Sequence, residues 1–284
     1  MLRKLTGSFL ITTIILLGSK GFAQTGDGSL QNFISALRDL RHPAITLDYL
    51  SASGAPGDKI NYNALQLSAS ATVLGGTHIW GSVPLRQQNG PLGSVSGIGD
   101  LTLVINQSLI DLAGADISVE LGTKLATGSV TEGSLPQSYQ NGTGTNDLLL
   151  SLNIMTSALD LGAGYELVGG RSMNQITRLK RGDDFIVHAG YMNRGESLDL
   201  GGELIGIWQI QESSMLNPVS QTKSFINVAS SNGLMLDALI KAQYRLGSMI
   251  AFNGTLGIPL NKFNQNDGGP TRGLTASAGI GISF

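Results

Sequence analysis

Residues 274–284 have the sequence LTASAGIGISF, in which every second residue is apolar. Leucine, alanine, isoleucine and phenylalanine occupy the even positions, and glycine, serine and threonine occupy the odd ones. Successive side chains of a β-strand point to opposite faces, so this alternation places all the larger apolar groups on one side. The stretch therefore predicts a strand with one oily face and one small or polar face.

The same alternation recurs along the chain from residue 43 onward. We predict about twelve strands, at residues 44–50, 60–74, 78–85, 98–110, 115–126, 145–156, 160–169, 184–193, 197–211, 234–246, 248–258 and 273–284. In the second segment Tyr62 is out of phase with Leu65 and Leu67, and a β-bulge near Asn63 would restore the phase.

Short and long connections alternate between these segments. The short ones are residues 75–77, 111–114, 157–159, 195–196 and Gly247, and the long ones are residues 51–59, 86–97, 127–144, 170–183, 212–233 and 259–272. Strict alternation is typical of an antiparallel up-and-down transmembrane β-barrel with periplasmic termini, tight periplasmic turns and larger outer loops. Apolar-face aromatics near the strand ends fit two interfacial girdles, with Tyr49, Phe185 and Trp208 at one end and Tyr191, Tyr244, Phe252 and Phe284 at the other.

The N-terminal part of the chain has a different pattern. Residues 1–23 combine Arg3 and Lys4, an apolar run and the small-x-small site at 21–23, which predicts a signal peptide; a retained membrane anchor is the alternative. Residues 24–42 are predicted as a periplasmic segment with a short amphipathic helix, which would dock at the periplasmic mouth or enter the lumen. A disordered leader is the alternative. Residues 43–284 are then the barrel.

Composition excludes several classes of protein. The net charge is −2, and removal of the leader with its three basic residues would make it −5, while Lys and Arg are thinly spread, so no nucleic-acid partner is expected. The absence of cysteine excludes a disulfide framework and thiolate metal sites.

Three stretches of the chain together resemble a known family. They are GIGDLTLVINQSL at 97–109, ELGTKLATG at 120–128 and NGTGTNDLLLSLNI at 141–154, with Ala126 where that family usually has proline. The sequence resembles the outer-membrane family named after the meta-pathway of phenol degradation. The resemblance implies an outer-membrane barrel that transports hydrophobic or aromatic compounds, and it carries over no ligand-binding residue.

Catalytic and cofactor chemistry finds little support in the sequence. An outer-membrane phospholipase keeps its nucleophilic serine and its histidine close together along one strand, in a segment that water reaches. None of His42, His78 and His188 has a serine two to four residues away in such a segment. The Gly-x-Gly pairs lie in predicted strands and lack the helix that a dinucleotide fingerprint requires. We therefore predict no enzyme activity, no cofactor and no metal.

Charged residues on the inner face are the candidates for lining a lumen, because hydrocarbon disfavours charge. The candidates are Asp116, Glu120, Lys124, Asp147, Glu166, His188, Glu203, Asp237, Lys241 and Arg245, together with Asp48 and Asp199. Hairpin geometry brings Lys124 near Asp147 and Glu203 near Lys241. Such pairs either brace the wall or line a solute path.

Twelve strands leave a narrow passage or a ligand-sized cavity. The sequence thus favours a passive outer-membrane channel for small solutes, and a barrel acting as adhesin or structural anchor through its outer loops is the alternative. Expected partners are outer-membrane lipid and lipopolysaccharide, the barrel-insertion machinery through Phe284, and a small-molecule solute. The basic loop 171–184, with Arg171, Arg178, Lys180 and Arg181, is a candidate for binding lipopolysaccharide phosphate.

Overall fold

The computed structural model describes residues 43–53, 59–219, 224–261 and 273–284. The predicted signal peptide and N-terminal helix lie outside these residues and stay predictions. The strands are β1 (Ala44–Ser53), β2 (Asn61–Leu74), β3 (Thr77–Gly90), β4 (Gly93–Ile98), β5 (Leu101–Leu112), β6 (Ala115–Leu125), β7 (Asp147–Met155), β8 (Leu159–Leu167), β9 (Asp184–Arg194), β10 (Leu198–Gln209), β11 (Ser214–Leu216), β12 (Phe225–Asn227), β13 (Gly233–Leu246), β14 (Ile250–Pro259) and β15 (Thr275–Ser283). Two short 3₁₀ turns, η2 (Glu132–Ser134) and η3 (Gln137–Tyr139), lie in the connection after β6.

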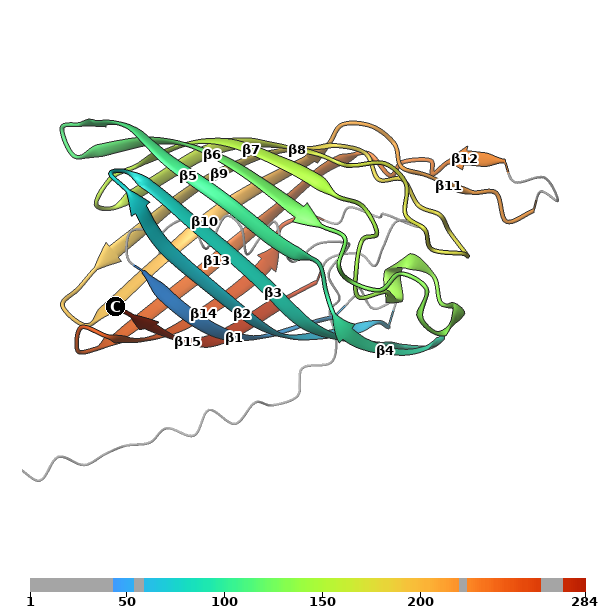
Figure 1. The fold of residues 1–284 in the computed structure, drawn as a ribbon, viewed down its shortest axis with the longest axis horizontal. Helices are drawn as coiled ribbons and strands as arrows, with labels where there is room; N and C mark the ends of the chain where they lie inside the picture. The colour runs from blue at the N-terminus through green and yellow to red at the C-terminus, as the bar shows by residue number, and fades with distance from the viewer. Residues whose placement is uncertain (1–42, 54–58, 220–223, 262–272) are drawn as a thin grey trace, which may run out of the picture.

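Within the described residues, twelve antiparallel strands close into a barrel (Figure 1). β1 pairs with β15 as well as with β2, so the sheet of the wall has no free edge at that seam. β4 pairs with Leu85–Gly90 at the C-terminal end of β3, beyond the part of β3 that pairs with β5. β11 and β12 form a separate two-stranded ribbon. No helix among the described residues is long and apolar enough to cross a membrane.

Glycines at left-handed backbone positions make the tight turns possible. Gly76, Gly114 and Gly247 have φ values of 81°, 84° and 71°, a region that costs other residues energy. The tight turns gather at one end of the barrel and the longer connections at the other (Figure 1). The predicted alternation of short and long connections is therefore confirmed for the described residues.

The outer face of the barrel is apolar over its whole circumference. Outward side chains that are at least two-fifths exposed include Ile45, Leu47, Leu65, Leu67, Leu103, Ile105, Leu121, Leu150, Leu152, Leu161, Val187, Leu200, Leu204 and Ile240. The aromatic residues predicted to form two girdles are exposed on this face, at Tyr49, Phe185, Trp208, Tyr191, Tyr244, Phe252 and Phe284. An apolar band flanked by aromatics is the surface that a transmembrane barrel presents to lipid.

The predicted bulge near Asn63 was wrong. Asn63 pairs in register with Ser51 and Gln87, and the register shift of this strand lies between Thr72 and Leu74 instead. Tyr62 points inward, where it is 6% exposed and has the guanidinium of Arg86 5.8 Å from its ring centre. Tyr62 therefore lies on the inner face of the strand, while Leu65 and Leu67 lie on the outer face. This difference of face explains why Tyr62 is out of phase with them, and no bulge is needed.

Candidate functional site in the barrel lumen

The predicted lumen residues lie on the inner face of the wall. Most are buried, namely Glu120, Lys124, Asp147, Glu166, His188, Glu203, Asp237 and Lys241, while Asp116 and Arg245 are half-buried. The structure brings them together in separate groups rather than in one site. Both predicted pairs are ion pairs, between Lys124 and Asp147 and between Lys241 and Glu203.

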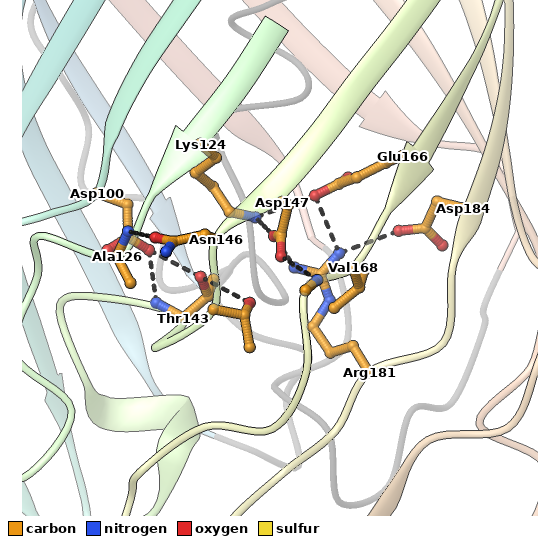
Figure 2. A network of polar contacts seen from close by, with 12 residues as sticks. Asp100, Lys124, Ala126, Thr143, Asn146, Asp147, Glu166, Val168, Arg181 and Asp184 are labelled. Carbon is orange, nitrogen blue, oxygen red and sulfur yellow. Dashed lines mark hydrogen bonds and ion pairs between the residues drawn. The ribbon is translucent and has the colours of Figure 1, made fainter.

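One group of charges lies where β6 to β9 meet the long connections (Figure 2). Lys124 Nζ contacts Asp147 and lies 3.0 Å from Glu166 Oε1. Arg181 lies 3.6 Å from Glu166 and 3.1 Å from Asp184 through its Nη2. The two cations thus hold three carboxylates from three strands together, and they fasten the loop that carries Arg181 to the wall.

The four basic residues of the loop 171–184 do not all face outward. The side chain of Arg181 is 14% exposed and faces the carboxylates inside the mouth. Lys180, the residue beside it, is exposed. Only part of the basic loop therefore remains available to outside partners.

Asp100 holds the connection between β6 and β7 at the barrel mouth through hydrogen bonds (Figure 2). Its Oδ1 accepts a hydrogen bond from the backbone N–H of Gly128 at 3.0 Å, and its Oδ2 accepts from the backbone and hydroxyl of Thr143 at 2.6 and 2.8 Å. Gly128 and Gly142 touch so closely that a Cβ on Gly128 would lie 2.6 Å from the Cα of Gly142. The three stretches that carry the family resemblance therefore meet in one structural joint.

A polar belt crosses the inner wall at mid-height from β5 to β7. Asn106 donates to Ser118 and Glu120 at 3.1 and 2.9 Å, and Ser151 donates to Glu120 at 2.5 Å. Asn153 Nδ2 in turn donates to Ser151 at 3.2 Å. Every residue of this part of the belt is buried, so its hydrogen bonds satisfy groups that water does not reach.

The belt continues across β9, β10 and β13. His188 Nε2 lies 3.2 Å from Asn153 Oδ1, His188 Nδ1 lies 3.2 Å from Glu203 Oε1, and Lys241 forms an ion pair with Glu203. Gly162 of β8 stands between Asn153 and His188, and a Cβ there would lie 2.1 Å from His188 Nε2. Glycine is required at this position because the two side chains meet directly over it.

An apolar cluster inside the lumen was not predicted. It consists of Trp80, Val104, Leu149, Ile186, Ile205, Ile207, Met235 and Leu239, all buried. The sequence carries a signal for it, since runs such as Leu148 to Leu150 are apolar at consecutive positions. Strands that are covered on both faces have such continuous runs, whereas a strand between lipid and water alternates. The lumen is therefore partly oily as well as charged.

A cavity of about 780 Å³ occupies the lumen toward the tight turns. Its wall includes Thr46, Ser68, Trp80, Lys241 and Ser277. Ion-paired Asp199 and Arg245 also line it. This volume lies within the range of small-molecule sites in proteins. The mixture of an indole, hydroxyls and charges lets the cavity contact both apolar and polar parts of a solute.

Comparison with known proteins identifies the fold. No protein-family model and no curated protein matches the chain. Among solved structures, the COG4313 outer membrane channel from Pseudomonas putida F1 is similar with a TM-score of 0.64 at 15% identity, over 86% of this chain and 96% of that one. The CymD monoaromatic hydrocarbon channel has a TM-score of 0.45 at 10% identity over 94% and 95%, and the NanC porin has 0.47 at 12% over 85% and 98%. The first likeness shows that the chain has the fold of an outer-membrane barrel.

Proposed function

We propose that the chain is an outer-membrane channel for the passive movement of small solutes. The observation that carries the proposal is the cavity of about 780 Å³ inside a closed barrel whose outer surface is apolar. Hydrocarbon on the outside stabilises such a surface, and a barrel satisfies every strand hydrogen bond within its own wall. The cavity then provides a solvated space inside the membrane.

The inner surface favours small solutes with an apolar part. The apolar cluster borders the cavity at Trp80, which belongs to both. A flat hydrophobic or aromatic molecule would contact the indole and the neighbouring aliphatic side chains, while Lys241 and the hydroxyls of Thr46 and Ser277 would face its polar group. Small hydrophobic or aromatic compounds are therefore the proposed solute class.

Membership in the meta-pathway phenol-degradation family is part of the same proposal. The joint around Asp100 supports it, because Gly128 and Thr143 come from separate motifs and bind the same carboxylate. Sequence stretches that must meet in one joint have a physical reason to occur together. Ala126 does not disturb the joint, since its backbone N–H donates to Asn146 Oδ1 at 2.8 Å.

Single-channel recording in a planar bilayer tests the channel function. The full chain should give reproducible conductance steps, and proteoliposomes should admit phenol-sized solutes faster than disaccharides. Ser277→Trp would fill part of the cavity and should lower both signals, whereas Ala276→Trp on the opposite face of the same strand is the matched control. Silence of the folded, inserted chain in every salt and solute would refute the proposal.

A second candidate, an adhesin or structural anchor, is favoured by a surface on the outer connections. The Arg171 guanidinium lies 3.7 Å from the ring centre of Phe225, and Arg178 lies 5.8 Å from the same ring. Burial and the neighbouring Arg178 lower the pKa of Arg171, and among the described residues neither arginine has a carboxylate within ion-pair distance. This cationic and aromatic surface fits the phosphates of lipopolysaccharide. Loss of lipopolysaccharide binding in Arg171→Gln with unchanged conductance would separate it from the channel.

A further inference from the structure

Three potential metal ligands converge inside the barrel wall. Asp160 of β8 and Glu203 of β10 both pair with Gly190 of β9, so they flank a residue that has no side chain. His188 lies two positions along the central strand and points to the same face. One ligand atom from each of Asp160, His188 and Glu203 lies within 4.8 Å of the other two, and the residues are 3%, 7% and 3% exposed.

The hydrogen bonds around His188 fix which ring nitrogen faces this cluster. Asn153 Nδ2 donates to Ser151 Oγ at 3.2 Å, so its Oδ1 accepts from His188 Nε2 at 3.2 Å. In a neutral imidazole with its proton on Nε2, Nδ1 then carries a lone pair. In that tautomer the lone pair is directed toward Glu203 Oε1, 3.2 Å away.

Two buried acceptors at this separation repel each other unless a positive charge lies between them, either a proton on Nδ1 or a metal ion that replaces it. A metal ion would provide that charge. Ligands of a tetrahedral zinc ion, with bonds of ~2.0–2.2 Å, stand roughly 3.3 Å apart, which matches the separation of Nδ1 and Oε1. Histidines that bind metals commonly donate their other N–H to an oxygen acceptor, as His188 does to Asn153.

We propose that Asp160, His188 and Glu203 form a binding site for a divalent transition-metal ion such as Zn²⁺. One imidazole and two carboxylates are a ligand set that zinc accepts, and three protein ligands leave a fourth position for water. Asn153 orients the imidazole, and Gly162 leaves the space in which the two side chains meet. The three ligands lie on three strands with no short motif, which is why the sequence alone predicted no metal.

Lys241 connects this site to the cavity. It pairs with the second carboxylate oxygen of Glu203, and it also lines the cavity. A metal ion on Oε1 would take up part of the negative charge that now holds Lys241. Metal binding should therefore make the cavity wall more positive and shift ion preference toward anions, an effect that rests on the proposed channel function.

Metal binding itself is tested without any transport measurement. The full chain, purified without an affinity tag, should bind one Zn²⁺ by calorimetry in detergent. His188→Gln and Asp160→Asn should weaken binding by more than the ~10- to 100-fold expected for Asn153→Leu, which removes only the orienting acceptor. His78→Gln is the matched control, since His78 contacts Thr72 near a tight turn and should leave binding unchanged.

Electron paramagnetic resonance of Cu²⁺ on the unmodified chain keeps the test independent of the variants' folding. The spectrum should show coupling to the nitrogen of a single imidazole. Absence of tight binding, nitrogen coupling to two imidazoles, or undiminished binding in a folded His188→Gln chain would overturn the proposal. Zn²⁺ binding by a chain that conducts no ions would refute the channel and leave the metal site standing.

Discussion

Replacement of Lys124 by methionine should destabilise the barrel strongly. The Lys124 side chain is 0% exposed, and its ammonium group contacts Asp147 and lies 3.0 Å from Glu166. Methionine keeps the apolar stem and removes the charge. The remaining carboxylates of Asp147, Glu166 and Asp184 would then share Arg181 as their cation.

The expected magnitude follows from the geometry of this cluster. Two unit charges 3.0 Å apart attract by roughly 5 kcal/mol at an effective dielectric constant of ~20. Removing one partner of a buried pair costs ~3–5 kcal/mol in measured cases, because the other charge stays buried without compensation. We therefore expect the free energy of unfolding of Lys124→Met to fall by about 3–5 kcal/mol.

Equilibrium urea unfolding in lipid vesicles measures this change, and a heat-modifiability gel verifies that the variant is folded at the start. Lys180→Met, an exposed lysine of the same mouth, should change stability by less than ~0.5 kcal/mol. Adding Asp147→Asn to Lys124→Met restores the balance of charge, and it should recover most of the loss. A folded Lys124→Met chain within ~1 kcal/mol of the parent would refute the assignment of this cluster as a structural clamp.

Four further predictions concern other parts of the chain. Lys241→Glu should shift ion selectivity toward cations, and it should also lower stability because Glu203 loses its partner. Lysine at the lipid-facing Leu150 should cost about 2–4 kcal/mol near the midplane and leave selectivity unchanged. A change of selectivity at Leu150 but not at Lys241 would mean that the inner and outer faces are assigned the wrong way round. Deleting Phe284 should lower the amount inserted by the barrel-insertion machinery, as quantified by surface labelling, and unchanged levels would exclude that role. Deleting residues 25–41 while keeping the signal and barrel should raise conductance at constant insertion, and an unchanged conductance would remove the predicted plug. Gly162→Ala should cost ~1–3 kcal/mol in urea unfolding because its Cβ would overlap His188, and a neutral result would contradict the close contact.

The strand pattern of this barrel was available from the sequence. Alternation with period two, as in Leu274 to Phe284, reports which side chains face lipid, and glycines such as Gly76 and Gly247 mark where the chain can turn tightly. Both signals are local, because a strand exposes its faces and a turn sets its backbone angles within a few residues. Strand number, alternation of connections and the inner face of the wall therefore followed from the sequence alone.

Contacts between neighbouring strands were partly available as well. Lys124 and Asp147 meet because a hairpin register places them opposite each other, and this prediction is confirmed. The recruitment of Arg181 from a loop to the same carboxylates was missed. A loop's path depends on packing over the mouth, which no local pattern encodes.

The interior of the barrel was decided by the tertiary structure. The apolar cluster around Trp80, the space over Gly162 and the convergence of Asp160, His188 and Glu203 each combine residues from several strands. Their meeting depends on how far each strand is shifted against the next around the closed wall, and a shift of two residues leaves every face unchanged while moving each side chain to new neighbours. The sequence by itself determined which side chains enter the lumen, and only the closed barrel determined which of them touch.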